Sequence, residues 1–167
     1  STTPSAGAGG ALTGEATQFV GYGSNATAVT AHTIADAVFR RWTDGETTPT
    51  RTDTYVRSNL TVTAVFRSVN GADLDWYAAR GIVPEAGEDW ADVDARAVPD
   101  KGTTLLQENT AVTDPGDTND VFRVTGISGG PPVSVTFTPA SAARVYTLQA
   151  TTNLASGPWV DVPGQGP

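Results

Sequence analysis

The chain has 167 residues, of which 18 are Asp or Glu and 10 are Lys or Arg, so that its formal net charge is −8 at pH 7. It contains no cysteine, which excludes disulfide bonds, cysteine-ligated zinc, iron–sulfur clusters and thiol catalysis. The negative charge argues against a nucleic-acid partner, because phosphate binding needs a basic surface, and no apolar run approaches the ~20 residues that span a membrane.

The residue types favour short strands. Threonine and valine are abundant, and both are β-branched residues that suit the pleated, half-exposed surface of a sheet. The 18 glycines and 11 prolines interrupt the chain often, as expected of strands joined by turns. We therefore expect a mainly β protein. The charged fraction of 17% is low, which favours an extracellular structural or adhesive module, secreted or on the cell surface.

The N-terminal segment, STTPSAGAGGA, has few side chains that can bury surface. Small side chains allow another strand to approach the backbone closely, so we expect this segment to pair with a sheet edge or with a neighbouring subunit. The residues assigned to this assembly contact are Thr3, Pro4, Gly7, Gly9 and Gly10.

Residues 12–69 carry the signals of strands. Residues 60–66 alternate between apolar and polar side chains, which predicts a strand with one apolar face. That face comprises Leu60, Val62, Ala64 and Phe66. Shorter strands are predicted over 18–23, 26–30 and 38–42. The Asp44-Gly45 pair that follows the last of these is typical of a hairpin turn.

The middle of the chain has a different character. Residues 73–81 have apolar side chains at helical spacing, acidic residues at their start and a glycine at their end, which predicts a short helix. A capping-box pattern predicts a second helix over 104–111. An acidic stretch, 85–100, lies between them. We interpret residues 70–120 as a helical, acidic linker.

The last part of the chain, residues 121–167, returns to strand signals. Apolar residues alternate with polar ones over 121–124, 133–138, 144–151 and 159–162. Four strands fall short of the usual ~7 of an immunoglobulin-type sandwich. This C-terminal module is therefore predicted to be a partial β-sandwich.

Two motifs in the first part resemble a known family. They are FRRWTDG at 39–45 and RTDTYVRSNLTVTAVF at 51–66. Together they resemble the divergent internalin-type B-repeat, whose pattern joins W-[ST]-D-G to R-T-D-x-x-V-x-x-N-[LIV]-T-V-T-A-x-F, over about residues 5–68. The resemblance implies a β-grasp-like module over residues 1–69, of the kind repeated in secreted and wall-anchored bacterial proteins. It implies spacer and adhesive uses and no catalytic residues.

A second motif, VYTLQATTNLASGPW at 145–159, lies near the end of the chain. It resembles an immunoglobulin- or fibronectin-like β-domain of large exported bacterial proteins, with the pattern Y-x-L-x-x-[ST]-x-[ND]-L-x-x-G-x-W. In that family more strands follow the tryptophan. The resemblance implies that the closing strands lie in further sequence or are donated by a neighbour. Trp159 marks the place where such a strand would add.

The acidic stretch contains candidate calcium ligands. Asp89, Asp92 and Asp94 form a D-x-x-D-x-D run. Carboxylates at such spacing can converge on one hard cation if the backbone wraps around it. Asp100 and Glu108 complete the candidate set.

The surroundings of this stretch resemble a calcium-binding acidic repeat, D-x-D-x-D-G-x-x-N-x-x-E. Gly102 and Glu108 match the turn and the last ligand of that pattern, but the side chains at its first three ligand positions cannot bind calcium. Those positions hold Ala97, Pro99 and Lys101. We therefore favour a solvated acidic loop whose Asp side chains cap turns, and we expect no cofactor.

The sequence gives little support for catalysis. His32 is the only histidine, so any Ser–His–Asp arrangement must use it, and no G-x-S-x-G motif is present. We expect no enzyme activity. The four tryptophans are interpreted as packing residues, although exposed tryptophan also stacks on sugars. Arg40 and Arg41 are assigned to subunit assembly, where they would meet the acidic linker of the same chain or of the next subunit.

These observations predict a non-enzymatic, exported bacterial structural protein. It would serve as a stalk or as the repeating subunit of an extracellular filament, in which strands added between subunits complete the partial module. The expected partner is a second copy of the chain. The alternative is an adhesin or carbohydrate-binding fragment of a larger surface protein, with a surface glycan as its partner.

Overall fold

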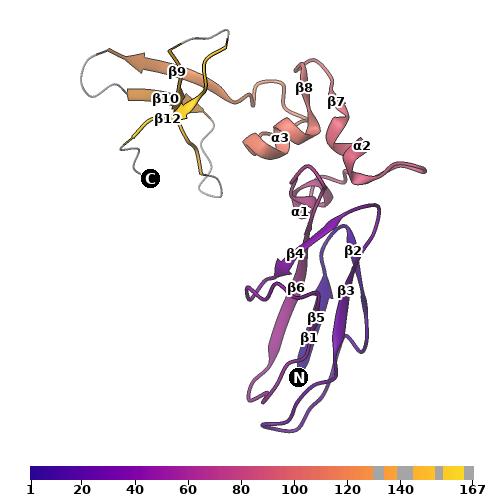
Figure 1. Ribbon diagram of the computed structural model, residues 1–167. Coiled ribbons are helices and arrows are strands. Elements are labelled where there is room, and N and C mark those ends of the chain that lie inside the picture. Colours follow the sequence, from indigo (N-terminus) through magenta and orange to yellow (C-terminus); the bar gives the residue numbers. More distant parts are fainter. Residues whose placement is uncertain (130–133, 139–144, 153–155, 164–167) are drawn as a thin grey trace. The chain divides into compact units, whose positions relative to one another are not determined.

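The computed structural model describes residues 1–129, 134–138, 145–152 and 156–163 (Figure 1). The chain divides into unit 1, over Ser1–Val121, and unit 2, over Phe122–Pro167. Within the described residues both units contain short strands in small sheets, and the few short helices lie in unit 1. The predicted mainly β fold is confirmed.

The first sheet of unit 1 has the strand order β1-β6-β4. β1 (Thr2–Ala6) runs parallel to β6 (Leu60–Arg67), and β4 (Val38–Trp42) pairs with the other side of β6 in the antiparallel direction. Alternate residues of β6 from Val62 to Phe66 are buried, as the sequence pattern predicts. This sheet therefore turns one face of its central strand to the core.

The second sheet has the order β2-β3-β5, with antiparallel pairing throughout. It consists of β2 (Gly10–Thr13), β3 (Val29–Thr33) and β5 (Thr50–Arg51). A Cβ atom placed on Gly10 would lie 2.0 Å from a ring atom of Phe66. The backbone of the second sheet thus contacts the first sheet directly at a position where only glycine fits.

The strands predicted over 18–23 and 26–30 differ from the structure. Residues 18–23 form a loop apart from one antiparallel bridge of Gln18 with Thr2, and the later strand begins only at Val29. The Gln18 side chain closes this loop, because its Oε1 accepts from the Thr27 backbone N–H at 2.7 Å and its Nε2 donates to the Thr27 carbonyl at 3.1 Å. A local side-chain bond here replaces the ladder that the alternating pattern predicts.

Short helices follow the first sheet: α1 (Leu74–Ala78), α2 (Trp90–Ala95) and α3 (Leu105–Ala111). The two predicted helices are confirmed as α1 and α3, and each begins at a side-chain N-cap, from Asp73 and Thr104 respectively. α2 lies in the acidic stretch, where no helix is predicted. A two-stranded hairpin of β7 (Ala97–Val98) and β8 (Thr103–Thr104) connects α2 to α3.

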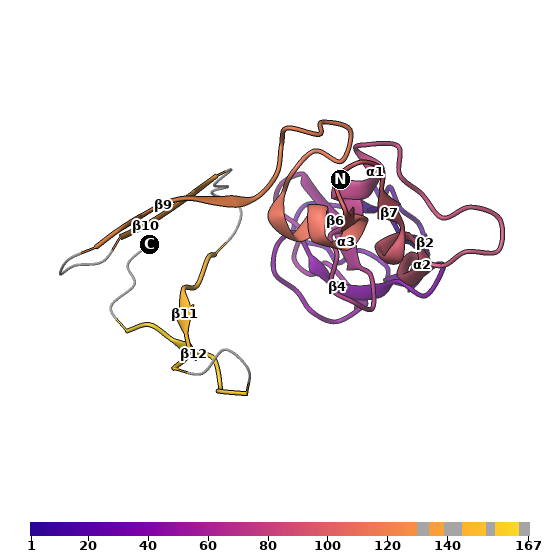
Figure 2. The same cartoon turned by 90° about the horizontal axis from the view of Figure 1, so that it is seen from above.

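The helices of unit 1 share the core of its strands. Tyr77 of α1 and Trp90 of α2 stack with ring centroids 6.1 Å apart, and Leu74 of α1 is fully buried. In the view of Figure 2 the three helices overlap the strands of the same unit. Strands and helices both contribute to one buried cluster, which comprises Val29, Ala31, Ala37, Trp42, Val62, Ala64, Phe66, Ala72, Leu74, Tyr77, Trp90, Val93, Val98 and Leu105. The division between residues 69 and 70 stays a prediction.

Unit 2 is thinly packed. Its described strands are β9 (Arg123–Ser128), β10 (Ser134–Thr138), β11 (Gln149–Ala150) and β12 (Val160–Asp161), in two separate two-stranded sheets. The rings of Phe122, Phe137 and Tyr146 lie within 5.8 Å of one another, centroid to centroid. None of the described residues of unit 2 is buried.

Candidate functional site

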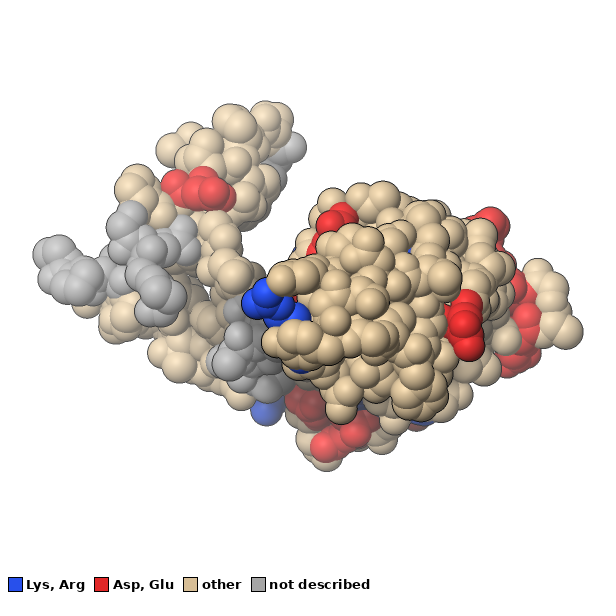
Figure 3. Space-filling view, turned by 90° about the horizontal axis from the view of Figure 1, so that it is seen from below, with Lys and Arg blue, Asp and Glu red and all other residues tan. Residues whose placement is uncertain are grey.

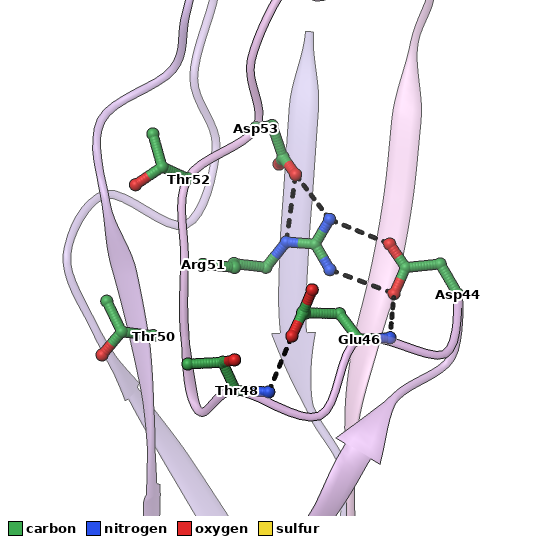
Figure 4. A pocket seen from close by; sticks show the side chains of 7 residues that line it. All are labelled: Asp44, Glu46, Thr48, Thr50, Arg51, Thr52 and Asp53. Carbon is green, nitrogen blue, oxygen red and sulfur yellow. Dashed lines mark hydrogen bonds and ion pairs between the residues drawn. The ribbon is translucent and has the colours of Figure 1, made fainter.

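The two B-repeat-like motifs meet at Arg51, on β5 (Figure 4). The Arg51 guanidinium donates to both oxygens of Asp44, at 3.3 and 3.0 Å, and its Nε donates to Asp53 Oδ1 at 3.1 Å. It also lies 4.9 Å from the ring centroid of Trp42. One arginine side chain therefore fastens the turn after β4 to the segment that leads into β6.

The charged groups of this cluster are paired with one another. The Arg51 side chain is 8% exposed, and burial alone would lower its pKa, but the bonds to Asp44 and Asp53 outweigh that effect and raise the pKa. The hydrogen bonds from Arg51 in turn lower the pKa of Asp44. The residues of the cluster also line a hollow of about 230 Å³. It is lined by Asp44, Glu46, Thr48, Thr50, Arg51, Thr52 and Asp53. Because Arg51 is already paired with two carboxylates, we interpret the motif as structural.

The candidate calcium ligands Asp89, Asp92 and Asp94 have separate roles around α2. Asp89 is the N-cap, and Asp92 accepts from the Asp89 backbone N–H, so that the two form a capping box. Asp94 is buried on the other side of the helix, where its Oδ1 accepts from the Tyr77 hydroxyl at 2.8 Å. Burial and this bond raise the pKa of Tyr77.

The two remaining candidates lie elsewhere. Asp100 is in the turn between β7 and β8 and has a left-handed backbone, with φ at 62°. Glu108 lies on α3 and is 2% exposed. Within the described ranges, no group of three or more His, Cys, Asp or Glu side chains is arranged to hold a metal ion. The structure thus does not bring the predicted ligands together.

Glu108 instead pairs with the single lysine of the chain. Lys101 Nζ donates to Glu108 Oε2 at 2.7 Å, and the Lys101 side chain is fully buried. The same Nζ donates to three backbone carbonyls, those of Asp114 at 2.9 Å, Asp117 at 3.2 Å and Asp120 at 2.8 Å. Lys101 therefore fastens the segment 113–121, which ends unit 1, onto the rest of that unit. We call this arrangement the Lys101 cage.

Two threonine hydroxyls complete the surroundings of Glu108. Thr103 Oγ1 donates to Oε1 at 2.6 Å, and Thr113 Oγ1 donates to Oε2 at 2.5 Å. Burial alone would raise the pKa of Glu108, but the bonds from Lys101, Thr103 and Thr113 outweigh it, so the pKa lies below its usual range. At neutral pH the carboxylate is charged, and both of its oxygens accept hydrogen bonds.

The N-terminal residues assigned to assembly are used inside the chain. Thr3 and Pro4 lie in β1, paired with β6. A Cβ on Gly7 would lie 2.8 Å from Asp75 Oδ1, and Gly9 has φ at +84°. Gly10 contacts the Phe66 ring, as described above. The small residues of this segment therefore allow close packing and a positive φ within unit 1.

The other residues assigned to assembly lie in strands. Arg40 is the extra residue of a β-bulge in β4, and it is exposed. Arg41 Nη1 donates to the carbonyls of Trp42 and Thr43, at 3.4 and 3.5 Å. In the part of the chain that the structure describes, neither arginine forms an ion pair with the acidic stretch. Trp159 is 56% exposed, just before β12.

His32 lies on β3, where its Nε2 is 2.7 Å from the Thr13 hydroxyl on the adjacent β2. No carboxylate hydrogen-bonds to this ring among the described residues. The functional feature that sequence reasoning missed is the Lys101 cage. Its signals are a solitary lysine, a glutamate seven residues later, and a threonine five residues before and another five residues after that glutamate. The three carbonyl partners carry no side-chain signal.

Residues 1–70 match the family described as the divergent InlB B-repeat domain. This confirms the first part of the resemblance found in the motifs, and it indicates a bacterial surface-protein domain with an extracellular or cell-surface location. No curated protein and no solved structure matches the chain. Among the described helices, none has the length and apolar character needed to span a membrane.

Proposed function

We propose that unit 1 is a non-enzymatic spacer of an exported bacterial surface protein and that it resists mechanical tension. The observation that carries this proposal is the parallel pairing of β1 with β6. The register runs from Thr2 opposite Leu60 to Ala6 opposite Ala64. The family match supports the proposal, because surface-protein repeats typically have no enzymatic role.

The parallel pair is placed so that tension shears it. β1 begins at the N-terminus, at the end of unit 1 opposite the helices, and β6 runs in the same direction into α1 (Figure 1). Leu60 N–H donates to the Ser1 carbonyl, and Gly7 N–H donates to the Ala64 carbonyl. A backbone hydrogen bond therefore flanks the β1–β6 pair at each end. A pull that separates Ser1 from the helices loads these bonds together rather than one after another.

The Lys101 cage fixes the other end of the load path. Tension on Val121 reaches the segment 113–121 first, and Lys101 holds three carbonyls of that segment. A buried, charge-assisted cluster is stronger than neutral hydrogen bonds of the same number. The cage therefore passes tension to the core without first unravelling the segment.

The test is forced unfolding of single molecules with Ser5→Pro. A parallel strand bonds through alternate residues, and the bonds at Ser1 and Gly7 place Ser5 on the bonding side. Proline removes that N–H, and we expect a lower unfolding force. Ser5→Ala is the matched control, because it keeps the N–H and removes only the hydroxyl. An unchanged force for Ser5→Pro would contradict the proposal.

We extend this proposal to a filament in which copies of the chain are joined by strand addition. The N-terminal segment forms β1, which pairs with β6 of the same chain. Unit 2 supplies the better candidates, since β9 and β10 pair only with each other among the described residues. A strand from a second copy could add to either outer edge. Fibres with a regular axial repeat in negative-stain images support this form, and particles of monomer size at high concentration oppose it.

Glycan binding is the second candidate function, favoured by the aromatic residues at the N-terminal end of unit 1. Phe19 is 90% exposed and Tyr22 81%, both on the loop between β2 and β3. Tyr55 is 59% exposed on the segment that precedes β6. Figure 3 looks onto this end, and most of the surface of unit 1 that faces the viewer carries no charged side chain. Aromatic faces on such a surface suit stacking against sugar rings.

Tyr55 has a strained backbone conformation that contacts with neighbouring residues stabilise. Its φ of 52° is rare for a non-glycine residue and is strained. Its N–H donates to Asn25 Oδ1 at 2.9 Å, and the Arg57 guanidinium lies 4.1 Å from its ring centroid. We expect Tyr55→Ala to weaken retention of the protein on immobilised chitin and cellulose, with Tyr146→Ala in unit 2 as control. Equal retention of both variants and the wild type would remove this candidate.

A further inference from the structure

The Lys101 cage has more acceptors than its ammonium group has protons. Four oxygens surround Nζ within 3.2 Å: one from Glu108 and one each from the carbonyls of Asp114, Asp117 and Asp120. A lysine ammonium has three N–H donors. At least two of the four oxygens therefore share one N–H. An oxygen shell of this kind is how proteins surround a hard metal cation.

The shell is shaped by bonds that do not involve lysine. Asp120 Oδ2 accepts from the Asp114 N–H at 2.7 Å, and Asp114 Oδ1 accepts from the Gly116 N–H at 2.9 Å. Asp117 Oδ1 accepts from the Asn119 N–H at 2.9 Å. These side chains fold the loop into successive turns. The loop is thus organised by its own aspartates, and its carbonyls point at a common centre.

Charge and size identify the cation that this shell would accept. Glu108 is the carboxylate that touches Nζ, and one positive charge balances it. The N···O distances of 2.7–3.2 Å exceed the 2.3–2.6 Å typical of calcium–oxygen bonds. Potassium has an ionic size close to that of ammonium and also carries one charge. A monovalent ion therefore fits without contraction of the loop.

We propose that segment 113–121 and Glu108 form a monovalent-cation site that the chain fills permanently with its own Lys101 ammonium. A chain with alanine at position 101 would bind potassium there. The lysine makes the fold of this segment independent of the surrounding salt, and removal of the lysine exposes the latent site. This inference does not depend on the spacer function.

The test is the salt dependence of the Tm of Lys101→Ala. Tm is measured at pH 7 in 300 mM potassium chloride, ammonium chloride or tetramethylammonium chloride, at equal ionic strength. Tetramethylammonium is too large for the shell. We expect Tm to be at least about 3 °C higher in potassium or ammonium than in tetramethylammonium, because an ion that binds only the folded state stabilises it.

Two controls isolate the site. The wild type should show little difference among the three salts, because its shell is filled. The double variant Lys101→Ala, Glu108→Gln should lose the potassium effect, because the carboxylate that balances the ion is gone. Equal Tm values for Lys101→Ala in all three salts would overturn the inference. Failure of this variant to fold in potassium chloride would also overturn it, since potassium should restore the shell.

Discussion

Arg51 shows how a sequence motif can be a structural requirement. Its planar guanidinium bonds Asp44 through both terminal nitrogens and Asp53 through Nε, while its face covers Trp42. The W-T-D-G and R-T-D motifs are therefore two halves of one contact. Sequence reasoning found both halves through the family pattern. It could not pair them, because the contact arises only when β5 lies beside the turn after β4.

Replacement of Arg51 tests this role. We expect Arg51→Ala to lower the free energy of unfolding by about 2 kcal/mol, below the 3–5 kcal/mol of fully buried pairs because the Asp44 side chain is 38% exposed. Arg40→Ala, on the exposed bulge of β4, is the control and should change stability by less than ~0.5 kcal/mol. Urea denaturation measures both. Similar small losses for the two variants would show that the Arg51 cluster contributes little.

Glu108 should make unit 1 sensitive to acid. Its pKa in the folded chain lies below the reference value of 4.5, so its contribution to stability is complete above pH 4.5 and is lost as pH falls through the folded pKa. Other carboxylates with lowered pKa, such as Asp44 and Glu88, add to the decline.

The variant Glu108→Gln isolates this contribution. Between pH 7 and pH 3 we expect the Tm of Glu108→Gln to fall less than that of the wild type, so that the two curves converge at acid pH. Thermal unfolding followed by circular dichroism gives both curves. Parallel curves would mean that the protonation of Glu108 is not linked to folding.

At the scale of elements, the sheet contact at Gly10 should tolerate no side chain. A Cβ there would overlap the Phe66 ring, so we expect Gly10→Ala to destabilise unit 1 by about 1–3 kcal/mol. Gly116→Ala is the control, since its nearest atom lies at 3.4 Å. In a double-mutant cycle Phe66→Leu should relieve part of the Gly10→Ala loss. Strictly additive losses, measured by urea denaturation, would show that the two positions are not in contact.

Elements with local signals were predictable, and elements made by distant pairing were not. The alternation of β6 and the caps of α1 and α3 depend only on residues that are close together in the sequence. The segment 18–23 also alternates, yet Gln18 bonds Thr27 and closes a loop instead. α2 is short, and its capping box of Asp89 and Asp92 is equally consistent with a metal-binding run. Local patterns cannot separate these alternatives.

For the whole molecule, the partner of the N-terminal segment is the most instructive comparison between the sequence and the structure. Its small residues predict close approach of another strand, and close approach is what the structure has. The strand that approaches is β6 of the same chain, and the side chain that contacts Gly10 is Phe66. The sequence shows that another strand can approach this backbone closely, but it does not show whether that strand belongs to the same chain or to a neighbouring subunit.

The two units should differ in stability. Unit 1 has a buried core, whereas no described residue of unit 2 is buried. We expect backbone amides of β6 to exchange with solvent at least about a thousandfold more slowly than those of β9 at low protein concentration. Hydrogen exchange with mass spectrometry reads both strands in one sample. Comparable protection of β9 in the monomer would show that unit 2 completes its own fold.

Forced unfolding in two pulling directions tests whether the β1–β6 pair resists tension. Because the chain has no cysteine, handles can be attached at Ser1→Cys with Val121→Cys, or at Ser1→Cys with Ser58→Cys. The first pair shears the parallel strands, and the second peels β1 from the start of β6. We predict an unfolding force at least about twofold higher in the first geometry. Equal forces in the two geometries would show that the β1–β6 pair does not resist tension.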